Sequence, residues 1–281
     1  MPAASQLTCL QIDGVSLAVD RIGRGAPVVC LTAVGHDAHD FDGLAERCGR
    51  RFEFIRIEWP GHGRSGPDRH SASAARYSDL LAGALKALGV EQPILIGNSI
   101  GGAAAICYAA QHSVRGLVLC DSGGLVEVGG ATRAFCSFFE RFFAAGERGA
   151  FWFAPAFALY YRLTLTQPAA RAQRQAIVRS GHRLAPVLRQ AWASFGRPEA
   201  DLRDLAARLD TPIWVAWAKQ DRTLPLALCL PTIRRLRHHS LTTFTGGHTP
   251  FLEQPDAFAQ GFMAFADALE PSKAVLEAVV A

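Results

Sequence analysis

A serine, an aspartate and a histidine stand in sequence contexts that support nucleophilic chemistry. Ser99 lies in Gly-Asn-Ser-Ile-Gly, where glycines at 97 and 101 leave room for a sharp turn between a buried strand and a helix. Such a turn places the hydroxyl at a helix N-terminus, whose free N–H groups stabilise a developing negative charge. The pattern therefore predicts that Ser99 is a nucleophile.

A serine hydroxyl attacks a carbonyl only when a base takes its proton and an acid orients that base. His248 lies in a Gly-Gly-His-Thr-Pro loop just before the last helical pattern, and Asp221 directly follows an apolar run. We expect His248 to be the base and Asp221 to be the acid. Asp121, which ends the preceding apolar run, is a rival for the acid, and position favours Asp221.

Alternating strand and helix patterns supply the framework for these residues. Helical spacing predicts helices over 71–88, 100–111 and 254–269. Short apolar runs predict strands at 7–12, 16–21, 27–31, 54–57, 93–96, 116–120, 212–217 and 241–244. The expected fold class is α/β, with a mostly parallel sheet flanked by helices and with reactive groups at the carboxyl ends of its strands.

Residues 125–204 show helical patterns and no strand signal. Phenylalanines at 135, 138, 139, 142 and 143 fall on one helical face. We expect this segment to form a helical cap (lid) inserted into a core domain of residues 1–124 and 205–281. Phe139 and Phe143 are expected to line the substrate pocket, and a membrane-anchoring stripe is the weaker alternative.

Four motifs together resemble the α/β-hydrolase superfamily over nearly the whole chain: the serine turn, the Asp221 loop, Gly247-His248, and Glu58-Trp-Pro-Gly-His-Gly-Arg-Ser65. The last is similar to the family's D-x-P-G-x-G-x-S loop, with Glu58 in place of the usual aspartate. The order serine, aspartate, histidine is also the family's order.

The resemblance implies an oxyanion hole made by the backbone N–H groups of Val34 and Ile100. The family usually carries His-Gly after the third strand, where this chain has Thr32-Ala33. We expect the Thr32 hydroxyl to stand where the family has an imidazole. Thr249 follows the histidine, at a position where carbon–carbon bond hydrolases of ring-cleavage products usually have tryptophan, and both threonines are expected at the pocket.

The expected activity is hydrolysis of a small, largely apolar carboxylic ester or lactone through an acyl-enzyme, with no cofactor and no metal. Two alternatives stay open. The Gly-Asn-Ser-x-Gly-Gly turn also resembles carbon–carbon bond hydrolases of ring-cleavage diketones, and arginines of residues 171–189 could bind a substrate carboxylate. The altered oxyanion loop leaves a ligand-binding receptor or scaffold with little turnover as the second alternative.

Composition narrows the partners to a small-molecule substrate. The 281 residues carry a net charge of +4, and the basic residues are too scattered for a nucleic-acid surface. No apolar run is long enough to span a bilayer, and no signal-peptide pattern is present. Seven cysteines without disulfide or zinc spacing favour a reducing, cytoplasmic location.

Overall fold

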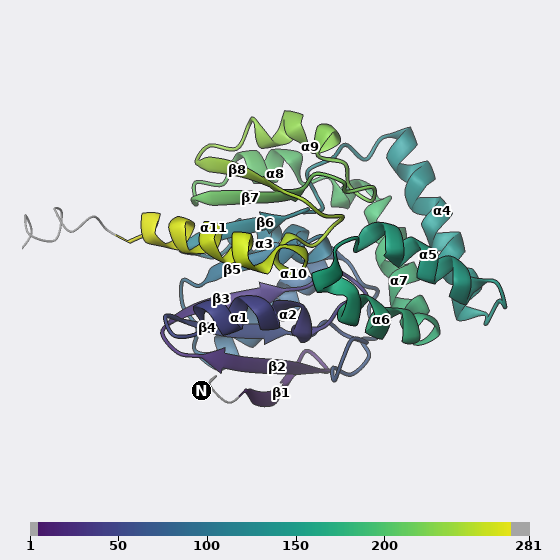
Figure 1. Cartoon of the computed structure of the whole chain (residues 1–281), viewed down its shortest axis with the longest axis horizontal. Coiled ribbons are helices and arrows are strands. Elements are labelled where there is room, and N and C mark those ends of the chain that lie inside the picture. The colour runs from purple at the N-terminus through teal and green to yellow at the C-terminus, as the bar shows by residue number, and fades with distance from the viewer. Residues whose placement is uncertain (1–4, 271–281) are drawn as a thin grey trace, which may run out of the picture.

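An eight-stranded sheet runs through residues 5–270, the part of the chain that the computed structural model describes (Figure 1). Its strands are β1 (Gln6–Ile12), β2 (Val15–Gly23), β3 (Ala26–Leu31), β4 (Phe52–Ile57), β5 (Ile94–Asn98), β6 (Gly116–Cys120), β7 (Ile213–Ala218) and β8 (His239–Phe244). Their order is β1-β2-β4-β3-β5-β6-β7-β8. β2 is antiparallel to both of its neighbours, and all other pairs are parallel.

Helices cover both faces of the sheet, so the predicted mostly parallel α/β fold is confirmed. One face carries α1 (Asp42–Cys48) and α11 (Pro255–Ala268), and the other carries α2 (Ala74–Leu88), α3 (Ile100–Ala109), α8 (Arg203–Ala207) and α9 (Leu226–Ile233). Every residue of β5, β6 and β7 is buried, which explains their uninterrupted apolar runs. Aromatic contacts seal each layer: Phe52 meets Phe262 on the first face, and Trp59 stacks on Tyr77 on the second.

Four helices follow β6 and lie beyond the ends of the central strands (Figure 1). They are α4 (Gly130–Glu147), α5 (Phe153–Thr164), α6 (Arg171–Arg179) and α7 (Gly181–Phe195), and we call them the α4–α7 segment. The remaining short elements are α10 (Pro250–Glu253) and 3-10 turns at Ala38–Phe41, Pro168–Ala170 and Pro198–Ala200. The segment has its own apolar interior, in which the ring of Phe139 stacks on Trp192 at 4.3 Å.

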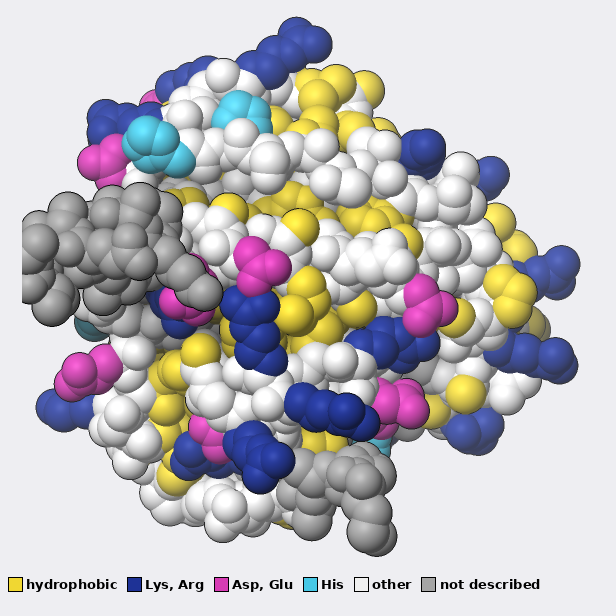
Figure 2. Space-filling view, turned by 60° about the vertical axis from the view of Figure 1, so that its left-hand side comes forward, with side chains coloured by type: hydrophobic (Ala, Val, Ile, Leu, Met, Phe, Trp, Pro, Cys, Tyr) yellow, Lys and Arg dark blue, Asp and Glu magenta, His cyan; other side chains and the backbone are white. Residues whose placement is uncertain are grey.

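The surface of the α4–α7 segment is both basic and apolar. Figure 2 shows basic and hydrophobic side chains next to one another along the right-hand side of the molecule, where this segment lies. Several large apolar side chains are exposed there, among them Phe138 and Phe151. The hydrophobic interior of the segment therefore does not account for all of its aromatic residues.

Candidate active site

Ser99 occupies a strained turn between β5 and α3. Its backbone has φ 54° and ψ −117°, which a residue with a side chain rarely adopts. The turn needs its glycines, because a Cβ on Gly97 would lie 2.5 Å from the carbonyl oxygen of Gly101. Within residues 5–270 the Ser99 side chain makes no capping hydrogen bond to α3. Helix capping therefore does not explain why a serine stands here.

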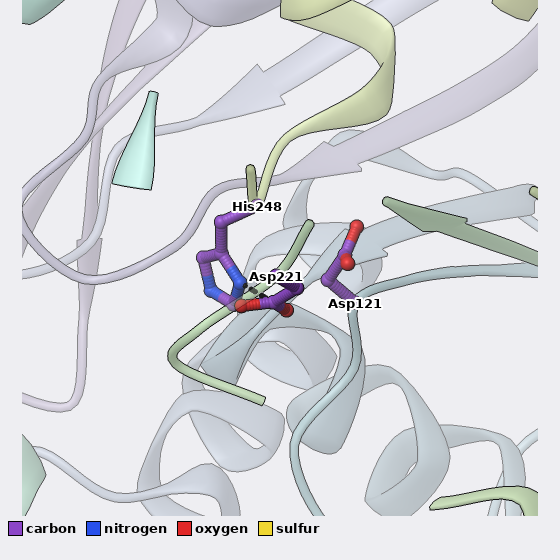
Figure 3. Close-up of side chains that lie close together, drawn as sticks. All are labelled: Asp121, Asp221 and His248. Atoms are coloured by element: carbon purple, nitrogen blue, oxygen red, sulfur yellow. Dashed lines mark hydrogen bonds and ion pairs between the residues drawn. The ribbon is translucent and has the colours of Figure 1, made fainter. Parts of the chain in front are cut away.

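His248 and Asp221 form a buried hydrogen-bonded pair. The Nδ1 atom of His248 lies 2.8 Å from Oδ2 of Asp221, and a dashed line joins them in Figure 3. The other carboxylate oxygen, Oδ1, accepts the backbone N–H groups of Thr223 and Leu224 at 2.8 and 2.9 Å. Burial raises the pKa of Asp221, but the His248 charge and these hydrogen bonds outweigh burial and lower it below its ordinary value. An ionised Asp221 holds the proton on Nδ1, so the other ring nitrogen of His248 is available as a base.

Asp121 lies beside this pair but does not contact the imidazole. Its Oδ1 accepts the backbone N–H of Ala218 at 3.0 Å, and its buried Oδ2 has no hydrogen-bond partner among residues 5–270. Burial first, and then the negative charge of Asp221, raise the pKa of Asp121 well above its ordinary value. The pKa values of these two neighbouring carboxyl groups are therefore shifted in opposite directions.

Ligand atoms of Asp121, Asp221 and His248 lie within 4.8 Å of one another, close enough to hold a metal ion. However, Nδ1 of His248 donates its proton to Oδ2 of Asp221, so Nδ1 offers no free lone pair to a metal ion. The arrangement suits proton transfer better than metal binding.

The His248 loop is held by two polar residues that sequence reasoning missed. Asn98, immediately before Ser99, donates its amide to the His248 carbonyl oxygen at 2.9 Å. The buried Glu253 carboxylate accepts the N–H groups of Gly247 and His248 through Oε2, at 2.7 and 3.0 Å. Its Oε1 accepts the N–H of Thr166, so Glu253 also ties the loop to the α4–α7 segment. The sequence signal that could have identified Glu253 is its place as an acidic residue in a first helical turn, just after a glycine-rich loop.

Val34 lines the same cavity as Ser99, and Ile100 is the first residue of α3. Within the described residues, neither of these two backbone N–H groups donates to a protein backbone acceptor. Both are thus free to bind an external oxygen. An oxyanion hole formed by these two N–H groups stays a prediction, with Thr32-Ala33 in place of the usual His-Gly.

His62 and Trp59 hold the loop that carries Val34. The Nε2 atom of His62 accepts the Gly35 N–H at 2.7 Å, and its Nδ1 lies 2.9 Å from the Pro60 carbonyl oxygen. The Trp59 indole donates to the Thr32 carbonyl oxygen at 2.9 Å. The sequence position of His62 does not fit a catalytic base. His62 instead positions the backbone of the loop that carries Val34, a role that the spacing of residues in the sequence does not reveal.

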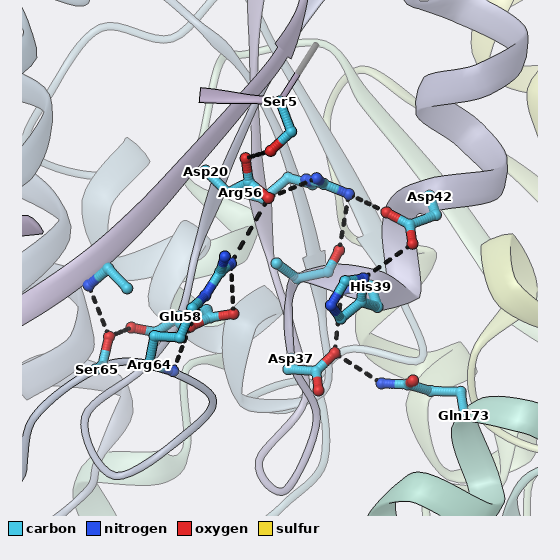
Figure 4. Close-up of polar contacts among 12 residues, drawn as sticks. Ser5, Asp20, Asp37, His39, Asp42, Arg56, Glu58, Arg64, Ser65 and Gln173 are labelled. Carbon is cyan, nitrogen blue, oxygen red and sulfur yellow. Dashed lines mark hydrogen bonds and ion pairs between the residues drawn. The ribbon is translucent and has the colours of Figure 1, made fainter. Parts of the chain in front are cut away.

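The Glu58–Ser65 loop that supplies these two residues is itself firmly braced (Figure 4). The buried Glu58 carboxylate accepts the backbone N–H of Arg64 at 2.6 Å and its guanidinium at 3.0 Å. The Ser65 hydroxyl donates to the Glu58 carbonyl oxygen and accepts the N–H of Ala18. Glu58 thus brings a carboxylate into the loop's interior, at the position where the family motif has aspartate.

Replacement of His62 by phenylalanine should lower kcat by about 10- to 100-fold with little change in KM. The substitution removes the acceptor of the Gly35 N–H, so the loop carrying Val34 loses its fixed position. Loss of one oxyanion donor typically costs roughly 10²- to 10³-fold in kcat, and misplacement should cost less than removal. Steady-state kinetics on a soluble ester measure both constants.

His62→Gln is the matched control, because a glutamine oxygen can still accept a backbone N–H. Burial lowers the pKa of His62 to about 4, so at neutral pH the wild-type ring is uncharged and accepts this bond. Recovery of kcat in His62→Gln would support the positioning role. Unchanged kcat in His62→Phe would contradict it.

Ser99, His248 and Val34 share a cavity of about 100 Å³. The apolar side chains around it come mainly from the segment between β6 and β7. They are Val126, Val128, Phe135, Cys136, Leu188, Trp192 and Phe195. The lining also includes the hydroxyl-bearing residues Thr132, Tyr160, Tyr161, Thr164 and Thr223. The cavity therefore combines an apolar wall with a few polar groups, as small-molecule sites do.

Four residues expected at the substrate pocket are not among those that line this cavity: Thr32, Phe139, Phe143 and Thr249. Phe143 is fully buried inside the α4–α7 segment, and Phe139 stacks behind Trp192. Thr32 and Thr249 are buried, and the Thr249 hydroxyl lies 3.3 Å from the Asn98 amide oxygen. A phenylalanine stripe covers more than one direction around its helix, so its members divide between the interior of the segment and the cavity.

His36 also lines the cavity. Its Nδ1 lies 2.6 Å from Oδ2 of Asp40, and both side chains are buried. His39 instead points outward and pairs with Asp42. The two histidines therefore do not converge as a metal site. The arginines of residues 171–189, considered as carboxylate ligands, do not line the cavity either.

Comparison with known proteins identifies the class of this fold and site. Residues 28–261 match the family model described as the alpha/beta hydrolase family, and the chain belongs to that family. The structure also resembles a thermophilic esterase from Thermogutta terrifontis, with a TM-score of 0.79 at 20% identity over 95% of this chain and all of that one.

Two relatives in sequence span most of the chain. An uncharacterised protein of Mycobacterium tuberculosis is 26% identical over 93% of this chain and 81% of its own length. A 2-hydroxy-6-oxononadienedioate/2-hydroxy-6-oxononatrienedioate hydrolase of Pseudomonas is 26% identical over 74% of this chain and 75% of its own. The protein is therefore a hydrolase, and its substrate has to be argued from the cavity.

Proposed function

We propose that this protein is a serine hydrolase that cleaves a small, largely apolar carboxylic ester or lactone through an acyl-enzyme. The observation that carries the proposal is the shared cavity: Ser99 and His248 line one small space with a mostly apolar wall, and His248 is bonded to the ionised Asp221. An engineered apolar cavity of about 150 Å³ holds benzene, so a cavity of about 100 Å³ suits a short acyl or alcohol group.

The chemistry follows from these positions. His248 takes the proton of Ser99 as the hydroxyl oxygen attacks the substrate carbonyl, and Asp221 stabilises the imidazolium that forms. The N–H groups of Val34 and Ile100 bind the oxygen that gains negative charge. His248 then protonates the leaving alcohol and, in the second half-reaction, activates water to release the acid.

Residues 125–204 act in this proposal as the cap over the site. Phe135 on α4 and Trp192 on α7 both line the cavity, so this segment supplies walls that the sheet does not. Its connection to the His248 loop through Glu253 and Thr166 holds it against the base. Substrate size is then set by the cap and chemistry by the core.

A carbon–carbon bond hydrolase of ring-cleavage diketones is the second candidate, and the Pseudomonas relative favours it. Such a substrate carries carboxylates, and the cavity lining contains no arginine to bind them. His36, held by Asp40, is the group facing the cavity that could fill that role. The apolar wall favours the ester reading. The arrangement of Ser99, His248 and Asp221 argues against a receptor with little turnover, because ligand binding alone does not require it.

A panel of p-nitrophenyl esters, from acetate to decanoate, tests the proposal alongside a ring-cleavage diketone. We expect the highest kcat/KM for short acyl chains and loss of that activity in Ser99→Ala. Turnover of the diketone without ester turnover would replace the first candidate with the second. Binding of substrates without turnover of either class would favour the receptor.

Trp192→Ala should move the preferred acyl chain toward longer esters. The indole forms part of the cavity wall, and its removal opens space beside Ser99 without touching His248 or Asp221. We expect the chain-length optimum of kcat/KM to rise by several methylene groups, each worth about 0.8 kcal/mol of burial. The measurement is the same ester panel.

Phe143→Leu is the matched control, since Phe143 is fully buried in the same segment but does not line the cavity. It should lower the free energy of unfolding and leave chain preference unchanged. An equal shift in both variants would assign the effect to general loosening of the segment.

A further inference from the structure

We propose that the outer face of the α4–α7 segment binds the surface of an anionic phospholipid bilayer. The proposal concerns where the protein resides while it acts, and it does not depend on the substrate argued above. Two independent observations carry it: exposed apolar side chains gather on α4 and α5, and unpaired arginines gather on α5 and α6 beside them.

Exposed apolar side chains cluster on α4, α5 and the turn between them. Of the nine large hydrophobic side chains exposed among residues 5–270, six fall between positions 135 and 163. Five of these, which we call the apolar face, are Phe138, Phe151, Trp152, Leu159 and Leu163. Phe151 is 93% exposed and Phe138 63% exposed, and exposed apolar side chains that cluster in this way mark an interaction site.

The apolar face is continuous with the rim of the cavity. Phe135 lines the cavity and is 41% exposed, and Phe138 follows it one helical turn later. The ring of Phe142, the next turn along α4, lies 6.0 Å from Trp152 at the start of α5. A surface bound to this face would therefore lie beside the opening toward Ser99.

The charge of the segment is strongly positive. Residues 130–195 contain nine arginines, no lysine and two acidic residues, a net charge of +7, whereas the whole chain carries only +4. The rest of the chain is thus net negative by three charges. An anionic surface would attract this segment and repel the remainder, which orients the protein as well as binding it.

Four of these arginines line one open groove between α5 and α6. They are Arg162, Arg171, Arg174 and Arg179, and no acidic residue lines the groove. In the described part of the chain none of the four forms an ion pair, although Arg174 also donates to the Leu165 carbonyl oxygen. Unpaired guanidinium groups in a groove suit phosphate oxygens, which they bind with two parallel hydrogen bonds.

The groove and the apolar face are neighbours on α5. Arg162 and Ala158, one turn apart, point into the groove, and Leu163 and Leu159 are the adjacent residues on the exposed side. Aromatic and leucine side chains beside arginines are the pattern of a helix that lies in the membrane interface, with its rings among the acyl chains and its cations among the headgroups. No helix among residues 5–270 is long and apolar enough to cross the bilayer.

Vesicle co-sedimentation tests the proposal, with phosphatidylcholine vesicles and with mixed phosphatidylcholine–phosphatidylglycerol vesicles. We expect at least tenfold tighter binding to the anionic vesicles, weakened by salt. Ser99→Ala should bind as well as the wild type. Among the five tryptophans only Trp152 is exposed, so its fluorescence should shift to the blue on binding.

Two double variants measure the arginine contribution and the apolar contribution to vesicle binding separately. Arg171→Gln with Arg179→Gln should weaken binding by roughly 5-fold per arginine, or about 1 kcal/mol each. Phe151→Ser with Trp152→Ser should weaken it on both kinds of vesicle. The matched controls are Arg208→Gln with Arg234→Gln, and Leu228→Ser, which are exposed residues outside the segment.

Three results would overturn the proposal. Equal, weak binding to both kinds of vesicle would exclude anionic lipid as the partner. An equal loss of vesicle binding in the control variants would show that the α4–α7 segment is not the membrane-binding surface. A wild-type dimer that becomes a monomer in Phe151→Ser with Trp152→Ser, without vesicle binding, would assign the apolar face to a second copy of the chain. An unchanged far-ultraviolet circular dichroism spectrum shows in each case that the variant is folded.

Discussion

Replacement of Ser99 by alanine should abolish turnover, lowering kcat by about 10⁵- to 10⁶-fold, while the fold stays intact. The nucleophile and its base act as one unit, so loss of the hydroxyl removes nearly all of the rate that the pair supplies. The backbone of Ser99 keeps φ 54° in the variant, because Gly97, Gly101 and the packing of β5 against α3 fix the turn. Stability should therefore change little.

Covalent labelling checks the same assignment. An active-site phosphonate should modify the wild type once, and mass spectrometry should place the adduct on Ser99. Ser122→Ala is the matched control, since this buried serine follows Asp121 and donates only to the Gly123 carbonyl oxygen. An adduct on any other residue, or full activity in Ser99→Ala, would refute the assignment.

Asp221→Asn should lower kcat by about four orders of magnitude, whereas Asp121→Asn should lower it less than tenfold. An asparagine at 221 favours the wrong tautomer of His248, and in a serine triad this costs roughly 10⁴-fold. Burial and the Asp221 charge raise the pKa of Asp121 and so favour its neutral form, and we expect an amide of similar shape to replace it with little electrostatic change. Its hydrogen bond from Ala218 can also be kept.

The two variants are controls for each other, because both acids are buried and both follow a strand of the same sheet. Rates should be compared with the free energies of unfolding, so that a loss of folding is not mistaken for a loss of chemistry. If Asp121→Asn is the more damaging in kcat at equal stability, then Asp121 is the acid that orients His248.

The site shows where sequence reasoning succeeds and where it stops. The strained turn at Ser99 was predictable because residues 97 and 101 must be glycine to avoid steric clashes with the backbone around the turn. The pairing of His248 with Asp221 required a choice between two acids that end neighbouring strands. Strand order places both near the imidazole, and only the loop after β7, with its N–H groups of Thr223 and Leu224, turns Asp221 toward Nδ1.

Other parts of the site left no readable signal. His62 acts on the backbone of Gly35 across 27 positions of sequence, and no spacing rule connects the two. The aromatic stripe of α4 was recognised as apolar, but its helical period could not divide Phe135, which lines the cavity, from Phe143, which is buried inside the segment. That division depends on how α4 packs against α7.

The sequence by itself determined the strands, the helices that cover them, the turn at Ser99 and the order of Ser99, Asp221 and His248 along the chain. These features follow from short-range sterics and from hydrophobic periodicity, which act within one element. The tertiary structure decided which acid meets His248, how the Val34 loop is held and which side chains form the cavity. These depend on contacts between elements far apart in the chain, where an ångström of strand register or helix packing changes the partner.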